Sequence, residues 1–385
     1  MTIPAGPETT RLVTDVLGQL ETEARQTRFS AAPNPCVGAA VIAGGEVVAR
    51  GYHREWGGAH AEVEAFAEAR RAGFEPETWE ALVVTLEPCS SEGKTPPCTD
   101  AILATPVPVI FVGSLDPEPR HRGRGVDLLR QAGREVEVLD GMVPLERVAP
   151  HFLRWIDKER VRRPRPWTIA KWAQTRSGHL TPPADIGEGR WISSPDSLAE
   201  VQHLRAGVDA IITGVGTVLA DDPRLTVRAP GKAHRGAPAR VILDSDLRTP
   251  PEARLFSSPG EGEHAGQVHV LCLPGSDGNR QRALFEAGAQ VHGVRGEDRT
   301  HLSIREVQAW LWDHGFRRVL VEAGPSLLSS YLDSGLVDQV RIYTGNVSGG
   351  RGDSLGSKVA GLRLQDLEHR ECGEDAVLEA FLESE

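Results

Sequence analysis

The 385-residue chain contains 54 acidic and 43 basic residues, which gives a net charge of −11 at pH 7. Its lysines and arginines form no cluster interleaved with aromatic residues, which argues against a nucleic-acid groove. A hydrophobic content of 39% is ordinary for a globular protein, and the length favours two or three domains. No apolar run is long enough to span a membrane, and no secretory signal pattern opens the sequence. Five cysteines in so long a chain are typical of a reducing compartment, so we expect a cytoplasmic protein.

Helical and strand-like patterns alternate in the first half. Apolar residues recur at helical spacing over 8–27, and the run Pro33-Asn34-Pro35 ends that helix. Strands at 36–43 and 46–52 are joined by a Gly44-Gly45 turn. The elements expected next are a helix from 59 to about 73, a strand at 82–86, a helix beginning near 98, a strand at 107–113, a helix near 125–132 and a strand at 135–139. Such alternation predicts a mostly parallel sheet with helices on both faces.

Three potential metal ligands lie in two short runs of this half. The first run is His60-Ala61-Glu62, and the second is Pro88-Cys89, followed after an eight-residue loop by Cys98. One histidine and two cysteines give zinc three protein ligands and leave the fourth position to water, as in catalytic sites. His-x-Glu followed by Pro-Cys and a second cysteine is the zinc deaminase signature, here with a longer cysteine spacing than usual. We therefore expect His60, Cys89 and Cys98 to bind zinc and Glu62 to transfer protons.

The predicted local structure supports this assignment. Cys89 follows a buried strand, and Thr95-Pro96-Pro97 predicts an N-cap with prolines in a first helical turn, which places Cys98 at a helix N-terminus. The helix macrodipole favours a thiolate at that position. His60 and Glu62 are two residues apart and can converge only in the first turn of their helix. The alternative, a core histidine with two unrelated thiols, is disfavoured because the order, spacing and flanking elements agree.

A new set of elements follows in the second half. A helical stretch within 141–163 ends in a basic, proline-broken run, which places the domain boundary near 147–164. The helix can belong to either side, and we divide the chain at 1–147 and 148–385. Ser194 and Pro195 predict the start of a helix. Strands are expected at 167–172, 209–213, 240–245 and 318–322, and the last leads through Gly324 into another helix. The backbone N–H groups at that helix start indicate either an anion site or only a tight turn.

Further runs accompany the zinc signature, namely Asn34-Pro35-Cys36-Val37-Gly38, Gly51-Tyr52-His53 and Gly93-Lys94-Thr95-Pro96-Pro97-Cys98. Together they resemble the deaminase half of the bifunctional riboflavin biosynthesis deaminase/reductase family. The resemblance implies a cytidine-deaminase-like three-layer α/β/α domain and, as substrate, a diaminopyrimidinone carrying a ribosylamino 5′-phosphate. It also implies that Asn34, His53 and Lys94 contact this substrate and that Asp116 lies near its ribose phosphate. Taken alone, Asn34 is equally explained as a turn residue, and His53 and Lys94 as surface residues.

Motifs of the second half include Lys171-x-Ala173, Trp191-Ile192, Leu204-Arg205-Ala206, Gly216-Thr217-Val218, Asp221-Asp222-Pro223 and Glu322-Ala323-Gly324-Pro325. They resemble the reductase half of the same family. The resemblance implies a dihydrofolate-reductase-like α/β fold that reduces the ribosyl group to ribityl with NADPH. The implied NADPH-binding residues are Lys171, Trp191, Thr217, Asp221, Ser245, Gly324, Pro325, Ser326 and Leu327. The implied substrate-binding residues are Arg205, Leu225, Arg228 and Glu322, and arginines suit a phosphate.

The chain departs from the family pattern in four places. Ser91 stands where the family usually has histidine, and Glu118 stands where it usually has asparagine. A carboxylate at position 118 would repel a substrate phosphate. Residues 175–178 lack the usual aspartate, and residues 343–350 replace a loop that contains Pro-Lys. The last two departures bear on the reductase site.

Our leading interpretation is a bifunctional enzyme that deaminates and then reduces a small pyrimidine ribosyl phosphate, without nucleic-acid or membrane partners. Whether the chain forms a homo-oligomer is left open. A second interpretation keeps the deaminase and makes the C-terminal half a degenerate module. A third, a nucleic-acid base deaminase, requires a basic, aromatic face around the pocket, which this acidic chain does not offer. A fourth, a zinc-stabilised scaffold, leaves Glu62 without a role.

Overall fold

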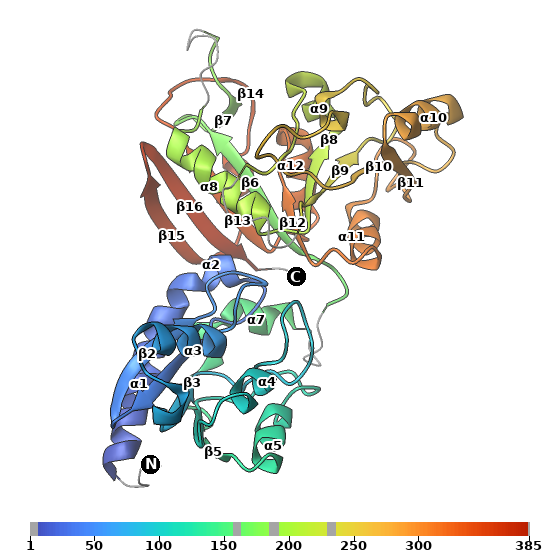
Figure 1. Cartoon of the computed structure of the whole chain (residues 1–385). Coiled ribbons are helices and arrows are strands. Elements are labelled where there is room, and N and C mark those ends of the chain that lie inside the picture. The colour runs from blue at the N-terminus through green and yellow to red at the C-terminus, as the bar shows by residue number, and fades with distance from the viewer. Residues whose placement is uncertain (1–6, 157–162, 185–191, 229–235, 384–385) are drawn as a thin grey trace. The chain divides into compact units, whose positions relative to one another are not determined.

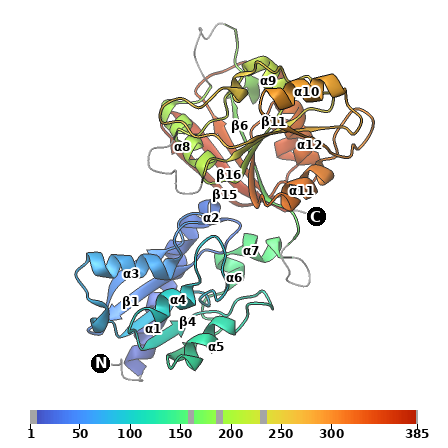
Figure 2. The same cartoon turned by 45° about the vertical axis from the view of Figure 1, so that its right-hand side comes forward.

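The structure, a computed structural model, describes residues 7–156, 163–184, 192–228 and 236–383. The chain forms two compact units, which are Met1–Arg163 and Pro164–Glu385 (Figure 1, Figure 2). None of the helices in the described ranges combines the length and the apolar character needed to cross a membrane.

The division between the units falls later than the 147/148 boundary expected from the sequence. The reason is that α7 (Pro150–Trp155), which the sequence analysis assigned to the second domain, packs with the first unit. Nε2 of His151 lies 3.0 Å from the carbonyl oxygen of Asn34, far back in the chain. Just before α7, Val148 joins the core beneath the N-terminal helix. Residues 148–156 therefore belong to the first unit.

The first unit contains a five-stranded sheet in the order β2-β1-β3-β4-β5. Its strands are β1 (Gly38–Ala43), β2 (Glu46–Tyr52), β3 (Ala81–Val84), β4 (Val109–Val112) and β5 (Glu135–Val138). β3, β4 and β5 run parallel, whereas β1 is antiparallel to both β2 and β3. The hairpin expected at Gly44-Gly45 is confirmed, and the expectation of a mostly parallel sheet is wrong for the pairing of β1 with β3. Gly44 and Gly45, with φ values of 62° and 75°, form the two-residue hairpin turn between β1 and β2.

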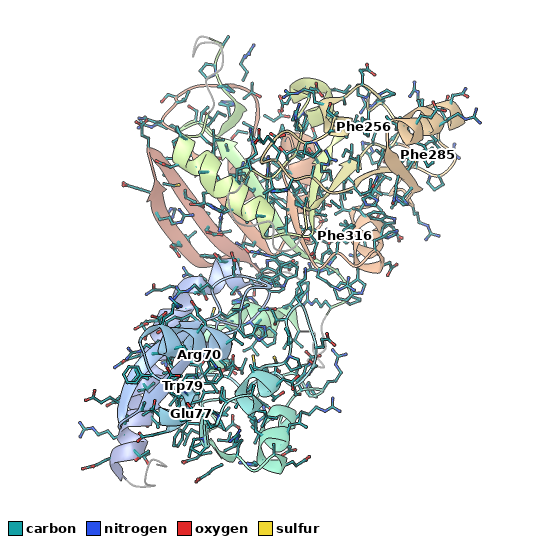
Figure 3. The ribbon with its side chains drawn as sticks, in the orientation of Figure 1. Arg70, Glu77, Trp79, Phe256, Phe285 and Phe316 are labelled. Atoms are coloured by element: carbon teal, nitrogen blue, oxygen red, sulfur yellow. The ribbon has the colours of Figure 1, made fainter. Side chains whose placement is uncertain are left out.

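Helices cover both faces of this sheet. Successive side chains of a strand point to opposite faces, so the strands contribute apolar side chains to a core on each face. The helices of the first unit are α1 (Pro7–Ala24), α2 (Arg28–Ala31), α3 (Ala61–Arg71), α4 (Cys98–Leu103), α5 (Arg124–Gln131), α6 (Leu145–Val148) and α7, with 3₁₀ turns at Arg25–Thr27 and Pro76–Thr78. α1 packs on one face, where Leu17 meets Ile42, and α3, α4 and α5 share the core of the other. In that second core Trp79 stacks on Phe66, with ring centroids 5.0 Å apart. Arg70 lies over the Trp79 ring, and both residues are labelled in Figure 3.

The second unit contains a nine-stranded sheet in the order β11-β10-β9-β8-β12-β6-β13-β16-β15. Its strands are β6 (Trp167–Gln174), β8 (Ala210–Gly214), β9 (Ala239–Leu243), β10 (Val268–Cys272), β11 (Ala289–Gly293), β12 (Arg318–Val321), β13 (Gln339–Thr344), β15 (Leu364–Cys372) and β16 (Asp375–Leu382). The strands from β11 to β13 run parallel, and β16 and β15 add an antiparallel edge. A separate two-stranded ribbon pairs β7 (His179–Thr181) with β14 (Arg351–Ser354).

Helices also cover both faces of the larger sheet. They are α8 (Pro195–Ala206), α9 (Val215–Asp221), α10 (Gly278–Glu286), α11 (Ile304–Asp313), α12 (Pro325–Asp333) and α13 (Gly356–Ala360), with a 3₁₀ turn at Arg254–Phe256. α11 and α12 bury Leu311 and Tyr331 in one core, whereas α9 and α10 bury Val218 and Leu284 in the other. The predicted start of α8 is confirmed, because the Ser194 hydroxyl caps the helix by accepting a backbone N–H.

Candidate active sites

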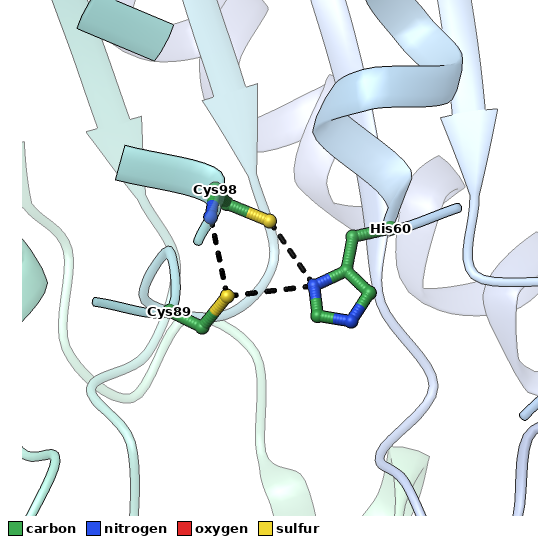
Figure 4. Close-up of side chains that lie close together, drawn as sticks. All are labelled: His60, Cys89 and Cys98. Atoms are coloured by element: carbon green, nitrogen blue, oxygen red, sulfur yellow. Dashed lines mark hydrogen bonds between the residues drawn. The ribbon is translucent and has the colours of Figure 1, made fainter. Parts of the chain in front are cut away.

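His60, Cys89 and Cys98 converge from three different elements (Figure 4). His60 is the N-cap of α3, Cys89 lies in the loop after β3, and Cys98 is the first residue of α4. Nδ1 of His60 lies 3.1 Å from Sγ of Cys98 and 3.5 Å from Sγ of Cys89. Among the described residues, no other group of three such ligands brings its atoms within 4.8 Å of one another.

The donor set and its spacing fit zinc. Tetrahedral zinc, with bonds of about 2.0 Å to nitrogen and 2.3 Å to sulfur, places those two atoms about 3.5 Å apart. Both observed nitrogen–sulfur separations are close to this value. Hydrogen bonds from the Cys98 thiol, from His60 and from the backbone N–H of Cys98 outweigh burial and lower the pKa of Cys89 to about 4. The thiolate that zinc requires is therefore favoured at this position.

Glu62 lies beside the three ligands, in the first turn of α3. Its side chain is buried, and Oε2 lies 3.2 Å from Sγ of Cys98. Burial raises the pKa of the Glu62 carboxyl. A carboxyl group with a raised pKa is suited to accept a proton and return it near neutral pH. The predicted convergence of His60 and Glu62 at the helix start is thus found in the structure.

A close approach between β2 and α3 determines where the start of α3 lies. A Cβ atom on Gly51 would lie 2.2 Å from the backbone nitrogen of Ala65 and 2.3 Å from the carbonyl oxygen of Ala61. Only glycine permits this separation of strand and helix. Glu64 connects the same two elements, because its Oε2 accepts the backbone N–H of Tyr52 over 2.9 Å. Residues of β2 and α3 therefore position the histidine ligand together.

A cavity of about 170 Å³ lies next to the three ligands. Of the predicted substrate residues, Asn34, His53 and Asp116 line it, whereas the Lys94 ammonium lies 3.8 Å from the centre of the Trp56 ring. The residues that line the cavity are Asn34, Pro35, Val37, His53, His60, Glu62, Leu86, Glu87, Pro88, Cys89, Ser90, Ser91, Asp116, Glu118, His121 and Phe152.

Asn34 and His53 form a hydrogen-bonded pair at this cavity. Nδ2 of Asn34 lies 3.1 Å from Nε2 of His53, and Nδ1 of His53 lies 3.0 Å from the carbonyl oxygen of Ala59. Because a carbonyl oxygen only accepts, Nδ1 is the donor and Nε2 accepts the Asn34 amide. His53 is buried, so the alternative of a surface histidine is wrong.

Glu87 of the Glu-Pro-Cys motif has a structural role that the sequence analysis did not assign. Its Oε1 accepts the N–H of Gly125 over 2.9 Å, and its Oε2 accepts those of Gly123 and Asp116 over 2.8 Å and 3.1 Å. The buried carboxylate therefore caps the start of α5 and holds the backbone of Asp116 at the cavity. Burial raises the pKa of Asp116 to about 6.

Glu118, which replaces the usual asparagine, is also buried and lines the cavity. It forms a salt bridge with Arg120, and Nε2 of His121 lies 3.7 Å from its other carboxylate oxygen. The negative charge that we expected to repel a substrate phosphate is thus balanced by Arg120. Nothing in the sequence pattern indicated this pairing.

Two further residues reach the site in ways that the sequence analysis missed. Thr95 is not the N-cap of α4, because Pro97 occupies that position and both prolines precede the helix. The prediction of prolines in the first helical turn is therefore wrong, and Oγ1 of Thr95 lies instead 3.3 Å from Nε2 of His60. Phe152 of α7 lines the cavity although we expected it in the reductase half. Only the packing of α7 on the first unit places it there.

In the second unit, Lys171, Arg205 and Glu322 form a partly buried cluster. Nε and Nη2 of Arg205 donate to the two Glu322 oxygens over 3.0 Å and 2.6 Å. Burial alone would raise the pKa of Glu322, but Arg205 and Lys171 outweigh it and hold that pKa at about 2. Burial lowers the pKa of Lys171. The structure thus brings together a predicted cofactor residue and two predicted substrate residues.

Thr217 and Gly324 meet at the ends of two adjacent parallel strands, β8 and β12. Oγ1 of Thr217 accepts the backbone N–H of Gly324 over 3.0 Å. Pro325, Ser326 and Leu327 then form the first turn of α12. The C-terminal ends of parallel strands, with helix N-termini beside them, are where such sheets bind nucleotides. These residues therefore fit a cofactor phosphate.

The other predicted reductase residues lie near this end of the sheet or outside the described part. Leu225 is buried in a left-handed backbone conformation with φ of 52°, and the backbone N–H of Arg228 donates to Gln202 of α8. Asp221 ends α9, where burial raises its pKa, and Ser245 follows β9. Trp191 lies outside the described residues.

The two segments in which the reductase half departs from its family pattern pack against each other. Oγ1 of Thr175 donates to the carbonyl oxygen of Gly349 over 2.6 Å, and the N–H of Arg176 donates to the carbonyl oxygen of Val347 over 2.7 Å. The N–H of Gly349 in turn donates to the Ser177 hydroxyl over 2.9 Å. The two departures thus form one connected structure.

Comparison with known proteins identifies both halves. Residues 14–114 match the cytidine and deoxycytidylate deaminase zinc-binding region, and residues 166–378 match the RibD C-terminal domain. Riboflavin biosynthesis protein RibD of Aquifex aeolicus is 33% identical over 90% of this chain and 92% of its own length. RibD of Escherichia coli K12 is 34% identical over 83% and 84%. The structure of Acinetobacter baumannii RibD is similar over 97% of this chain and 99% of that one, with a TM-score of 0.66 and 27% identity.

The fold and the two sites define a zinc-dependent deaminase of the cytidine deaminase class joined to a dihydrofolate-reductase-like reductase domain. The fold class predicted from the sequence is confirmed. The chain belongs to the RibD family of riboflavin biosynthesis proteins. It is a bifunctional diaminohydroxyphosphoribosylaminopyrimidine deaminase and 5-amino-6-(5-phosphoribosylamino)uracil reductase, with zinc and NADPH as cofactors. The interpretations as a nucleic-acid base deaminase and as a zinc-stabilised scaffold are therefore set aside.

Proposed function

We propose that deamination in the first unit depends on His60, Cys89 and Cys98 as zinc ligands and on Glu62 as the proton-transfer residue. The observation that carries this proposal is the convergence of the three ligand atoms beside the buried Glu62 carboxylate. Zinc, when bound, acts as a Lewis acid that lowers the pKa of a water molecule to about 7. Glu62 accepts a proton from the attacking water and delivers it to the leaving amine nitrogen, so that ammonia departs.

The cavity residues orient the substrate in this proposal. The Asn34 amide and the His53 ring, held together by their hydrogen bond, contact the pyrimidine, and Asp116 lies near the ribose phosphate. Lys94 contacts the substrate from its loop, which borders the cavity through Ser90 and Ser91. The burial of His53 and its hydrogen bond to Asn34 support this role, because the geometry of the pair is set before substrate arrives.

For the reductase, we propose that Arg205, Leu225, Arg228 and Glu322 bind the ribosyl substrate. Residues proposed to bind NADPH are Lys171, Trp191, Thr217, Asp221, Ser245, Gly324, Pro325, Ser326 and Leu327. NADPH supplies the hydride, and the protein supplies orientation and charge. The paired donors of Arg205 hold Glu322 in one orientation, and the N–H groups that begin α12 suit a phosphate.

We also propose a cytoplasmic location and a small pyrimidine ribosyl phosphate, not a nucleic acid, as the substrate. The location is supported by five cysteines that form no disulfide bond. The substrate is supported by the cavity beside the three candidate ligands, because Asn34, His53 and Asp116 line it. A homo-oligomer stays a proposal that size measurement in solution would test.

One experiment tests both halves. The diaminopyrimidinone phosphate is supplied with and without NADPH, and ammonia release and NADPH absorbance are followed together. We expect ammonia in both cases and a loss of absorbance only when substrate and NADPH are both present. Ammonia release without NADPH oxidation would favour a C-terminal half that does not reduce. Absence of ammonia from the zinc-loaded protein would contradict the proposal for the first unit.

A further inference from the structure

Thr95 contacts the histidine ligand on the side opposite the cysteines. Oγ1 of Thr95 lies 3.3 Å from Nε2 of His60, while Nδ1 of the same ring faces Sγ of Cys98 and Sγ of Cys89 at 3.1 Å and 3.5 Å. Both nitrogens of the ring therefore have a defined neighbour. The neighbour of Nε2 comes from the loop between the two cysteine ligands.

The chemistry of imidazole connects these two contacts. A neutral ring carries one proton, and the nitrogen that binds a metal has to be the one without it. In the tautomer that can bind a metal through Nδ1, the proton is on Nε2, where the neighbouring hydroxyl oxygen of Thr95 can accept it in a hydrogen bond. Partners of this kind fix the tautomer and orientation of metal-binding histidines in many proteins.

We propose that Thr95 is a positioning residue that holds His60 with a bare Nδ1 directed at the zinc site. This inference rests on the proposed zinc ligands His60, Cys89 and Cys98. It adds a role for a hydroxyl group that touches no reacting atom.

The backbone around Thr95 is suited to this role. Pro96 disfavours helical backbone at the preceding residue, Thr95, and so restricts its conformation. Neither Pro96 nor Pro97 has an N–H group, and the carbonyl oxygen of Thr95 accepts the N–H of Gly93 over 3.2 Å. α4 then begins directly at Cys98. Thr95 is thus carried on a stiff segment that ends at a ligand.

The contact between Thr95 and His60 offers a physical reason for the length of the loop between Cys89 and Cys98. Zinc deaminases with the short signature have two residues between the cysteines. This chain has eight, Ser90 to Pro97, and Thr95 lies within this longer loop. We infer that the longer spacing supplies the outer partner of the histidine from the same loop that connects the two sulfur ligands.

The test is the zinc dissociation constant of the full-length protein, measured by competition with a chromogenic chelator. Thr95→Val keeps the branched shape and removes the hydroxyl, and we expect it to weaken zinc binding by about 10- to 100-fold. Thr95→Ser keeps the hydroxyl, and we expect it to bind zinc about as tightly as the parent. Thr105→Val is the matched control, because it removes a buried threonine hydroxyl of the same unit that bonds only the carbonyl oxygen of Ile102.

Each outcome decides a different point. Equal zinc affinity in Thr95→Val and the parent, with weakened binding in His60→Ala, would overturn the role of Thr95 and leave the ligand assignment intact. Unchanged affinity in His60→Ala would instead overturn the ligand assignment itself. Equal weakening in Thr95→Val and Thr105→Val would attribute the effect to general packing and overturn the proposal. Failure of Thr95→Ser to restore binding would do the same.

Discussion

The backbone N–H of Cys98 donates a hydrogen bond to Sγ of Cys89 over 3.2 Å. Cys98 is the first residue of α4, so no carbonyl group of that helix can accept this N–H. The bond therefore uses an otherwise unsatisfied donor to stabilise negative charge on the other ligand. Cys98 therefore positions Cys89 through its backbone N–H.

Replacing Cys89 with serine tests this arrangement. In this variant the serine oxygen can still accept the N–H of Cys98, but the thiolate that binds zinc strongly is lost. We expect Cys89→Ser to retain no zinc after dialysis against a chelator and to release no ammonia. Cys372→Ser is the control, because Cys372 lies in β15 of the second unit. The zinc content of both variants is measured by atomic absorption. A zinc content of Cys89→Ser equal to that of the parent would count against the ligand assignment.

Glu62→Gln separates proton transfer from metal binding. Glutamine has nearly the shape of glutamate but cannot accept a proton, so we expect ammonia release to fall by about 10²- to 10⁴-fold. Zinc content should stay at the parent level, because the three ligands are untouched. Glu68→Gln changes a residue of the same helix that pairs with Arg71 near the surface, and it should keep full activity. Retained ammonia release in Glu62→Gln would refute the proposed role.

Gly51→Ala tests the close approach of β2 and α3. The added methyl group would lie 2.2 Å from a backbone nitrogen and 2.3 Å from a carbonyl oxygen of α3, so the helix has to move. Overpacking of this kind costs about 1–3 kcal/mol, and more where backbone resists. Gly18→Ala, in the interior of α1 with nothing within 4 Å of the added atom, should stabilise by about 0.5–1 kcal/mol. Urea unfolding of both variants gives the comparison, and no destabilisation by Gly51→Ala would contradict the stated contact.

The convergence of the three candidate zinc ligands could be predicted from the sequence because their signals are local. His60 and Glu62 are adjacent to a helix start, Cys89 follows a strand, and each such boundary has a recognisable pattern. The alternation of helices and strands was equally accessible. The predicted start of α8 at Ser194 is confirmed for the same reason, since a serine followed by proline marks a helix start within a few residues.

The misses all involve contacts between distant segments. The role of Glu87 depends on Gly123 and Gly125, which follow it by more than thirty residues. Phe152 reaches the cavity only because α7 packs on the first unit. The antiparallel pairing of β1 with β3 likewise depends on which strands become neighbours and in which direction they run. The periodicity within either strand does not indicate this. Thr95 was predicted to be the N-cap of α4 because the local sequence has a capping pattern. Its contact with His60, 35 residues earlier, leaves no such local pattern.

Glu322→Gln tests the charge cluster of the reductase site. The pKa of Glu322 in the folded protein, about 2, lies below its ordinary value. Its charge therefore stabilises the fold above about pH 4.3, and this contribution is lost as the pH falls toward 2. Removing the charge leaves Arg205 and Lys171 without balance, and we expect a loss of about 3–5 kcal/mol. NADPH oxidation should fall while ammonia release persists.

The control for this variant is Asp333→Asn, which breaks an exposed pair with Lys358. Such surface pairs contribute only about 0–1 kcal/mol. Urea unfolding and NADPH oxidation are measured on both proteins. Equal losses of stability in the two variants would show that the partly buried cluster is no more important than a surface ion pair.

Three histidines gather where β10, β11 and the end of α11 meet. Nδ1 of His269 lies 3.2 Å from Nε2 of His292, and His314 stacks on Trp310 with ring centroids 3.9 Å apart. His292 and His314 are themselves neighbours, with centroids 5.4 Å apart. Burial first, and then the neighbouring His292 and His314, lower the pKa of His269 to about 4. The folded protein therefore favours the neutral ring of His269.

The acid sensitivity of the second unit should follow from this cluster. An unfolded histidine titrates near pH 6.5, so the neutral ring of His269 costs nothing above that pH and opposes folding as the pH falls from about 6.5 toward 4. Between pH 7.5 and pH 5 we expect a loss of up to about 2 kcal/mol from this group alone. His269→Gln, which cannot be protonated, should lower stability at both pH values but reduce the difference between them. His301→Gln, at an exposed histidine, should leave the difference unchanged. Urea unfolding of the full-length proteins at pH 7.5 and pH 5 measures the difference in the free energy of unfolding. An equal difference in His269→Gln and the parent would refute the role of His269 in acid sensitivity.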